Sequence, residues 1–329
     1  MSSTNPPEPS TIVRTAVGYM AAKQLFAATR TGLFRAFGKE PKTCAELAAD
    51  CGITEANARI LADSMCALSL LDRSGDRYSL TAETAYYLGA AAALDLAPFL
   101  GFLDTISLPH WLRCYDNTVT TGMPGKLTLD DAGWSNFMNG VQTYNSLHAT
   151  MLSTVFDYSP YRSLLDFGGL SPAFAIGALE QNPSLGATLI YDPVFIDSVR
   201  QAFSDANLSG RATITPGATE STVPGGEFDL ILTSHVIHRF SAAQNRLIFA
   251  NLRQAAEPGA KLLVLDFFLD DDPRQRDLDA LHAGEYFVID GTVVYPINEV
   301  RDWLSAAGWT PGETLTLPGS PRVLTATAA

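Results

Sequence analysis

The stretch LLDFGGLSPAF, residues 164–174, decides the fold of the C-terminal half of this 329-residue chain. Its first residues are apolar, as in a buried strand, a glycine pair follows, and the residues after Pro172 indicate a helix. In doubly wound α/β folds, a turn between such a strand and helix is where backbone N–H groups meet a nucleotide-bearing cofactor. Leu170 and Pro172 stand where two further glycines are expected. The turn is therefore recognisable but partly filled.

Strands alternate with helices from residue 161 onward. We predict strands over residues 163–167, 187–192, 212–216, 228–235 and 261–268. One intervening helix is capped by Ser241 and ends before Pro258, and a last helix ends at Gly308, followed by two strands of an antiparallel edge. This order is typical of a mostly parallel sheet covered by helices on both faces. Ligands of such sheets bind beyond the carboxyl ends of the strands.

The N-terminal part is predicted to be mainly helical. Apolar residues recur every three or four positions over residues 13–37, and Thr43 with Glu46 forms a capping box. Alternating polar and apolar residues around Ser74-Gly75 suit a small hairpin, so this part resembles a winged-helix module. Its candidate recognition segment, TEANARILADSM, has one arginine against two acids, which favours dimerisation over DNA contact.

These patterns predict four segments. Residues 1–12 are expected to be a disordered arm, 13–100 a winged-helix dimerisation domain, 101–160 a helical linker and pocket lid, and 161–329 a Rossmann-like domain. The arm lacks the basic start and apolar core of a secretory signal. The lid contains WSNFMNGVQTYNSLHATML, whose aromatic and sulfur side chains suit either core packing or the cover of an apolar ligand pocket.

Composition excludes several classes of function. Hydrophobic residues make up 47% and charged residues 17% of the chain, which is typical of a globular protein. A net charge of -13 without a lysine or arginine run opposes nucleic-acid binding. No apolar run approaches the roughly 20 residues that span a bilayer, so no membrane contact is expected. The cysteines Cys44, Cys51, Cys66 and Cys114 lack metal-binding or redox spacing. We expect free thiols, no metal site and a cytoplasmic protein.

Polar residues end several of the predicted strands. Asp166 precedes the Gly168-Gly169 turn, and Asp192 ends the second strand, where a carboxylate can bind ribose hydroxyls or cap the next helix. His235 and His238 follow the fourth strand in TSHVIHRFS. A histidine there can be a general base near neutral pH, because the unperturbed pKa of imidazole is about 6.5, or it can be structural.

Six segments in order carry a resemblance that covers nearly the whole chain. They are YSLTAETAYYL, LLDFGG, IYDP, FDLILTSHVIHRFS, LRQAAEPGAKLLVLDFFLDD and NEVRDWLSAAGW. Their order resembles the S-adenosylmethionine-dependent O-methyltransferases of the plant caffeate and bacterial natural-product type. The resemblance implies a methyltransferase with S-adenosylmethionine as cofactor and a small aromatic or polyketide-type substrate. It also implies a homodimer in which the N-terminal helices help to close the partner's pocket.

The resemblance also implies residue roles. His238 matches the catalytic base, with His235 and Arg239 as further catalytic candidates, and Asp266 matches a position that is usually acidic. The cofactor-binding candidates are Asp166, Gly168, Gly169, Asp192, Gly217 and Ser234. The substrate-pocket candidates are Trp134, Met138, Tyr144, His148 and Glu285.

The chain departs from the family pattern at several positions. Besides Leu170 and Pro172, Ala218 replaces an Asp, Arg239 replaces the Asp after the base, and Val294 replaces a Glu that assists it. Each lost charge-assisted hydrogen bond to a ligand costs about 1.5–3 kcal/mol. Three functions therefore stay open: methyl transfer with His238 as base, a repurposed enzyme for cofactor-independent elimination, cyclisation or rearrangement, and a non-catalytic ligand binder.

Overall fold

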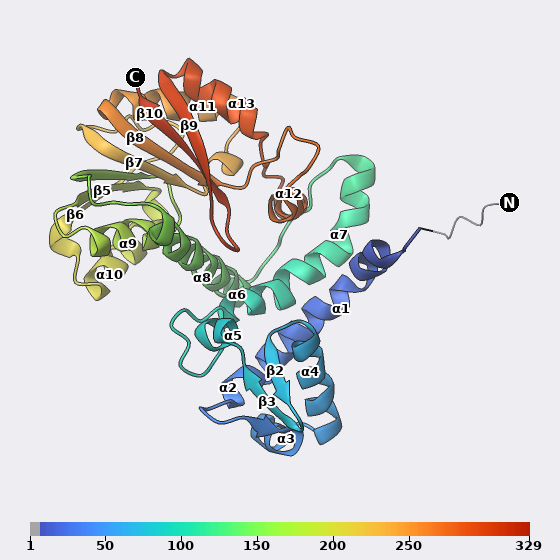
Figure 1. The fold of residues 1–329 in the computed structure, drawn as a ribbon. Coiled ribbons are helices and arrows are strands. Elements are labelled where there is room, and N and C mark those ends of the chain that lie inside the picture. The colour runs from blue at the N-terminus through green and yellow to red at the C-terminus, as the bar shows by residue number, and fades with distance from the viewer. Residues whose placement is uncertain (1–6) are drawn as a thin grey trace. The chain divides into compact units, whose positions relative to one another are not determined.

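The structure, a computed structural model, describes residues 7–329. The chain divides into two units, Met1–Leu108 with Asp131–Thr143, and Pro109–Asp130 with Tyr144–Ala329. Figure 1 colours the chain from blue at the N-terminus to red at the C-terminus. The segment 101–160, predicted as a linker and lid, contributes residues to both units.

The N-terminal unit is mainly helical. Its elements are α1 (Ser10–Arg30), α2 (Leu33–Ala36), β1 (Lys42–Thr43), α3 (Cys44–Cys51), α4 (Glu55–Ala67), β2 (Leu71–Ser74), β3 (Arg77–Leu80), α5 (Ala82–Tyr87), α6 (Ala97–Phe102), the π-helix η1 (Leu103–Ser107) and the first half of α8 (Asp131–Val155). The predicted capping box of Thr43 and Glu46 and the hairpin around Ser74-Gly75 are confirmed. Helix α1 begins at Ser10, so the last residues of the arm predicted to be disordered are helical.

The C-terminal unit contains a sheet whose strands, within the described residues, follow the order β6-β5-β4-β7-β8-β10-β9. Its strands are β4 (Ser163–Phe167), β5 (Gly186–Tyr191), β6 (Ala212–Pro216), β7 (Phe228–Ser234), β8 (Ala256–Asp266), β9 (Trp309–Thr316) and β10 (Arg322–Ala328). Its α-helices are α7 (Leu108–Thr121), the second half of α8, α9 (Ala173–Gln181), α10 (Ile196–Asp205), α11 (Ala242–Gln254), α12 (Asp277–Ile289) and α13 (Ile297–Ala306). Short 3-10 turns are η2 (Pro193–Phe195), η3 (Ser209–Arg211) and η4 (Ile237–Arg239). The pairs among β4–β8 are parallel and β10 is antiparallel to both neighbours, which confirms the predicted sheet.

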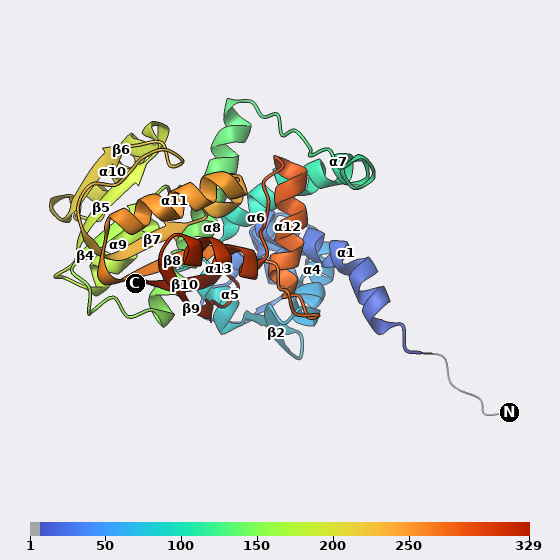
Figure 2. The ribbon, with the colours of Figure 1, turned by 90° about the horizontal axis from the view of Figure 1, so that it is seen from above.

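Helices cover both faces of this sheet (Figures 1 and 2). Because successive strand residues point to opposite faces, Leu165 and Ile231 pack with α11 and α13, whereas Leu164 and Leu230 pack with α8, α9 and α10. Both faces of the central strands are thus apolar and buried, as expected for parallel strands. The polar residues of these strands are left at the strand ends, where a site can form.

Several predicted boundaries were wrong, including the start of β5 at Gly186, the end of β8 at Asp266 and the end of α13 at Ala306. Strands β5 and β7 end one residue early, so Asp192 and His235 follow their strands. Strand β8 begins at Ala256 rather than residue 261, because Ala256 already pairs with Phe228. Pairing is then interrupted around Pro258 and Gly259 and resumes at Lys261. Proline cannot donate to the ladder and Gly259 has φ +79°, so the strand carries an irregularity there.

None of the helices among residues 7–329 combines the length and the apolarity that crossing a membrane requires.

Candidate active site

The site lies at the point in the sheet where the strand order changes direction, between β4 and β7. Strands β4 and β7 are neighbours, β5 and β6 extend from β4, and β8 extends from β7. The turn after β4 and the segment after β7 therefore meet at one crevice beyond the carboxyl ends of the strands. This position brings residues 168–172 together with residues 235–239.

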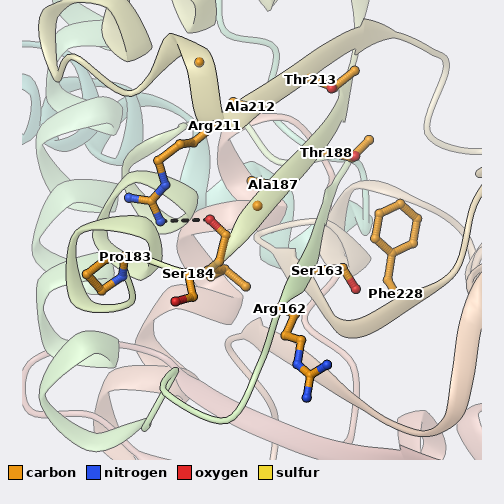
Figure 3. A pocket seen from close by; sticks show the side chains of 13 residues that line it. Arg162, Ser163, Pro183, Ser184, Ala187, Thr188, Arg211, Ala212, Thr213 and Phe228 are labelled. Atoms are coloured by element: carbon orange, nitrogen blue, oxygen red, sulfur yellow. Dashed lines mark hydrogen bonds between the residues drawn. The ribbon is translucent and has the colours of Figure 1, made fainter.

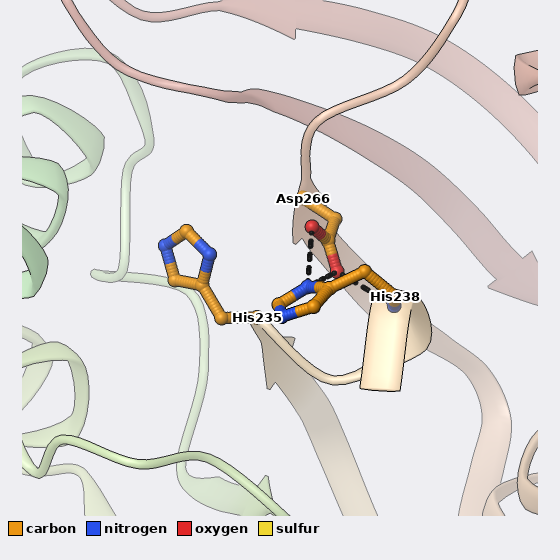
Figure 4. A group of neighbouring side chains, drawn as sticks. All are labelled: His235, His238 and Asp266. Atoms are coloured by element: carbon orange, nitrogen blue, oxygen red, sulfur yellow. Dashed lines mark hydrogen bonds and ion pairs between the residues drawn. The ribbon is translucent and has the colours of Figure 1, made fainter. Parts of the chain in front are cut away.

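A histidine–carboxylate pair lies at this edge (Figure 4). His238 Nδ1, on η4, is 2.9 Å from Oδ1 and 3.0 Å from Oδ2 of Asp266, the last residue of β8. The backbone N–H groups of Phe267 and His238 also donate to this carboxylate. Burial opposes ionisation of Asp266, but the neighbouring His238 holds its pKa below the ordinary value.

The carboxylate fixes the tautomer of His238. An ionised carboxylate only accepts hydrogen bonds, so Nδ1 carries the proton that it donates to Asp266. In the neutral ring Nε2 is then the proton acceptor, as a general base requires. The His238 side chain is 10% exposed, so a ligand can reach it.

A second histidine pair lies beside the first. His148 Nδ1, on α8, is 2.9 Å from Nε2 of His235. Burial lowers the pKa of His235 to about 3 and that of His148 well below its ordinary value, so both rings are neutral. His235 has φ +55°, a backbone conformation that turns the chain sharply between β7 and η4. The predicted candidates His148, His235 and His238 are thus brought together.

Aromatic rings from α12 and from the segment after β8 lie beside His238. The Tyr286 ring lies 4.4 Å from the His238 ring, and His282 stacks on Phe267 at 3.9 Å between ring centroids. His282 Nδ1 donates to the Leu278 carbonyl at 2.7 Å, so its Nε2 accepts from the Tyr144 hydroxyl at 3.3 Å. These rings give the space beside His238 an apolar, aromatic border.

Glu285 also belongs to this group. Its carboxylate lies 4.0 Å from His282 Nε2 on the same helix. The pocket candidates Tyr144, His148 and Glu285 therefore lie in one connected cluster of the C-terminal unit.

A buried carboxyl group lies under the turn after β4. Asp166 is fully buried, and burial raises its pKa to about 7 although a hydrogen bond from Tyr191 opposes this shift. The Tyr191 hydroxyl is 2.9 Å from both Asp166 Oδ2 and the Ser171 carbonyl. Asp166 Oδ1 has no hydrogen-bond partner.

Neighbouring protein atoms leave no room for a side chain at Gly168 and Gly169. A Cβ on Gly168, which has φ +72°, would lie 2.4 Å from Thr219 Cγ2, and one on Gly169 would lie 2.8 Å from the Tyr191 hydroxyl. Internal packing against Thr219 and Tyr191 already excludes a side chain at both positions.

Gly217 is constrained in the same way. Its Cβ would lie 2.8 Å from both Ile190 Cγ2 and Thr222 Oγ1. Pro172 directly precedes α9, so it ends the turn where the helix begins, and Leu170 is half-buried.

Arg239 reaches across the crevice to this turn. Its Nη2 donates to the carbonyl of Gly168, and its Nε is buried without a partner. Ser234 Oγ is likewise buried without a partner. Together with Asp166 Oδ1, these unpaired polar atoms fit a polar ligand, because buried polar groups are normally hydrogen-bonded.

Asp192 caps η2. It is exposed, and its Oδ1 accepts the N–H of Val194 at 3.0 Å, which confirms the capping role that the sequence left open. Its other carboxylate oxygen remains available to a ligand hydroxyl. Val294, in place of a family Glu, is 4% exposed, while the N–H of Val293 donates to the His238 carbonyl. Asp266 is therefore the acid that orients the His238 ring.

Trp134 and Met138 lie in the N-terminal unit, on the first half of α8. Trp134 is exposed and packs edge-on against Phe137 at 5.4 Å. Their assignment to a substrate pocket stays a prediction.

The ligand atoms of His235, His238 and Asp266 lie within 4.8 Å of one another, a composition that can hold a metal ion (Figure 4). Arg239 interacts electrostatically with the Asp266 carboxylate, and its positive charge opposes a divalent cation there. The expectation of no metal stays a prediction.

A separate hollow of about 560 Å³ lies at the opposite, amino end of β4, β5 and β6 (Figure 3). It is lined by residues such as Ser163, Thr188 and Thr213, with none of the candidate site residues among them. The Arg211 guanidinium beside it is bound by the carbonyls of Leu179, Asn182 and Leu185. That arginine holds the protein's own loops, so the hollow adds nothing to the site.

Sequence reasoning missed some residues of the site. Phe267, Tyr191 and Thr219 were not singled out, because each is an ordinary core residue in sequence. Asp266 was noted only as a usually acidic position. The position of Asp266 at the end of β8 could have indicated the pair, because β8 neighbours β7 and His238 follows β7.

The fold and the site define a doubly wound enzyme domain with a histidine–carboxylate pair at its switch point. The sequence profile of the O-methyltransferase domain matches residues 109–310, and the chain belongs to this family. It is 29% identical over 327 residues to a 3-hydroxy-5-methyl-1-naphthoate 3-O-methyltransferase of Streptomyces sahachiroi, covering 96% of this chain and 94% of that protein. It is 25% identical to the tetracenomycin polyketide synthesis 8-O-methyl transferase of Streptomyces glaucescens, covering 94% of each.

A solved structure shares the fold over the whole length. The human N-acetylserotonin methyltransferase in complex with SAM superposes with a TM-score of 0.80 at 21% identity, and the match covers 100% of both chains.

Proposed function

We propose that this protein is an S-adenosylmethionine-dependent O-methyltransferase that acts on a hydroxyl of a small aromatic or polyketide-type natural product. The observation that carries this proposal is the His238–Asp266 pair at the switch point of the sheet. The relatives that act on naphthoate and tetracenomycin hydroxyls support the substrate class. The aromatic border from Phe267, His282 and Tyr286 suits the same class.

The chain offers polar groups suited to this cofactor. The turn at Gly168 and Gly169 would carry its polar end, and Asp192 would accept hydrogen bonds from ribose hydroxyls. The unpaired Ser234 Oγ and Asp166 Oδ1 lie under the same turn. When bound, S-adenosylmethionine supplies an electrophilic methyl carbon on a sulfonium.

His238 would act as the general base. Its Nε2 accepts the proton of the substrate hydroxyl, and the resulting imidazolium donates from Nδ1 to Asp266. The carboxylate both orients the ring and stabilises its positive charge, while the buried neutral pair of His148 and His235 adds no competing charge. The aromatic rings beside His238 hold the substrate in line and exclude water.

The test uses the purified protein, S-adenosylmethionine and a panel of hydroxynaphthoates and phenols. We expect methyl ether products, and His238→Asn should lower kcat by about 100-fold or more while cofactor binding by calorimetry stays intact. Unchanged turnover in His238→Asn would remove His238 from the mechanism.

A second candidate function is a cofactor-independent elimination, cyclisation or rearrangement. The observation that favours it is the Arg239 guanidinium bound to the Gly168 carbonyl inside the cofactor turn. In that case His238, His235 and Arg239 would polarise the substrate. Incorporation of an isotope-labelled methyl group into product would exclude this alternative.

We further propose a homodimer in the cytoplasm. Helix α1 leaves apolar side chains exposed in a single chain, among them Val13, Val17 and Met20. A contiguous apolar face on a helix is typical of an interface. All four cysteines are unpaired, as in a reducing compartment.

A further inference from the structure

The cofactor crevice already contains a cation of the protein itself. Arg239 is half-buried, its Nε is enclosed without a partner, its Nη2 donates to the Gly168 carbonyl, and an arginine keeps its charge in proteins. Its side chain comes from η4, one residue after the base His238, and bridges to the turn after β4. The family pattern has an Asp at the position of Arg239, so a cation at this position is a departure from the family.

Arg239 follows His238 directly in the chain and reaches the Gly168 turn, so it joins the two parts of the site. A base can deprotonate the attacking hydroxyl only if substrate oxygen, methyl carbon and sulfur are in contact next to it. If His238 is the base and the Gly168 turn holds the cofactor, the charge of Arg239 would lie close to the sulfonium.

Within the described residues, no carboxylate forms an ion pair with Arg239, since Asp266 pairs with His238 and the Arg239 Nη2 donates to a carbonyl. Asp192 is exposed to water, and burial raises the pKa of Asp166 to about 7. Besides Asp266 and Asp192, the half-buried Glu220 carboxylate also interacts electrostatically with Arg239. A positively charged ligand at this crevice would thus meet a second, poorly compensated cation in a region of low dielectric.

We propose that Arg239 sets the charge selectivity of the cofactor site, weakening the sulfonium form relative to the neutral thioether S-adenosylhomocysteine. This inference rests on the proposed function. The two ligands differ by one methyl group and one positive charge, so the ratio of their dissociation constants measures the effect of that charge. Strong retention of the product by the enzyme is the functional consequence.

The experiment is calorimetric titration of the full-length protein with each ligand separately. We expect the wild type to bind S-adenosylhomocysteine at least about tenfold more tightly than S-adenosylmethionine. Arg239→Gln should shrink this ratio about tenfold, whereas Arg239→Lys should keep it, because the charge remains. Arg200→Gln, at an exposed arginine of α10, is the matched control and should leave the ratio unchanged.

The outcomes separate the two proposals. Equal ratios in the wild type and Arg239→Gln would overturn the selectivity role while leaving the cofactor assignment intact. Absence of binding of both ligands to the wild type and to Arg239→Gln would overturn both proposals. If Arg239→Gln does not fold, a wild type that binds S-adenosylmethionine as tightly as S-adenosylhomocysteine still overturns the selectivity role.

Discussion

The pKa values of two buried aspartates at the carboxyl edge of the sheet are shifted in opposite directions. Asp266 accepts hydrogen bonds from His238 and from the backbone N–H of Phe267, and its pKa lies below the ordinary value. Asp166 has one hydrogen-bond donor, Tyr191, and burial raises its pKa to about 7. Burial opposes ionisation of both carboxyl groups, and the neighbouring His238 outweighs it at Asp266, whereas the hydrogen bond from Tyr191 does not outweigh it at Asp166.

At the residue scale, Asp266→Asn should slow methyl transfer. An Asn side chain can donate its amide N–H to His238 Nδ1 and so favour the wrong tautomer, with Nε2 protonated. We expect kcat to fall by about 100-fold with a small change in KM, measured with the substrate found in the phenol screen. Asp302→Asn, at an exposed position of α13, is the matched control. A wild-type kcat in Asp266→Asn would contradict the orienting role.

A second residue-scale prediction concerns pH. Because the pKa of Asp166 is raised from 3.8 to about 7 on folding, the folded state binds more protons than the unfolded state between these values. The free energy of unfolding should therefore fall as pH rises from about 4 to about 7.

In Asp166→Asn, which keeps an acceptor for Tyr191, this part of the pH dependence should disappear. Its size is a few kcal/mol at most, since one pKa unit corresponds to about 1.4 kcal/mol. Urea unfolding at pH 5 and pH 8 measures it. An unchanged pH profile in the variant would show that Asp166 is not the titrating group.

At the scale of elements, helix ends and strand irregularities follow local rules. Ser241 and Gln244 form a capping box at the start of α11, and Thr54 and Thr81 cap α4 and α5. The irregularity of β8 depends on Gly259, which has φ +79° and open space around its Cα. The register after the irregularity pairs Ser234 with Leu265, so the ends of β7 and β8, followed by His238 and closed by Asp266, lie side by side.

We expect Gly259→Ala to destabilise the protein by about 1 kcal/mol through backbone strain alone, because no neighbouring atom would clash. Gly259→Asn should cost less, since Asn tolerates positive φ. Gly225→Ala, where the added Cβ also meets open space but φ is not positive, should have little effect. Thermal unfolding compares the three variants, and equal melting temperatures for Ala at positions 225 and 259 would contradict the strain argument.

At the scale of the whole molecule, α1 exposes apolar side chains to solvent in a single chain. Val13 is 53% exposed and Tyr19 63%. Light scattering on a sizing column should give about twice the chain mass of 35.3 kDa.

Val13→Glu with Val17→Glu should shift this mass to that of a monomer. Ile60→Glu, at an exposed position of α4, is the control and should remain dimeric. A monomeric wild type at micromolar concentration would contradict the homodimer.

The sequence by itself determined the order of elements and part of their ends. The apolar runs of the central strands, the glycine turn after residue 167 and the caps at Thr43 and Ser241 depend on neighbours in the chain, so they are readable without a structure. The predicted start of β8 failed because its first pair, with Phe228, is a contact between strands.

The tertiary structure alone decided which polar side chains meet. The contacts of His238 with Asp266, of His148 with His235 and of Arg239 with Gly168 span 28, 87 and 71 residues. They depend on the order of β4, β7 and β8 and on the helix that packs beside them. Local propensities carry no information on such pairings, because only the closed sheet brings these strand ends to one crevice.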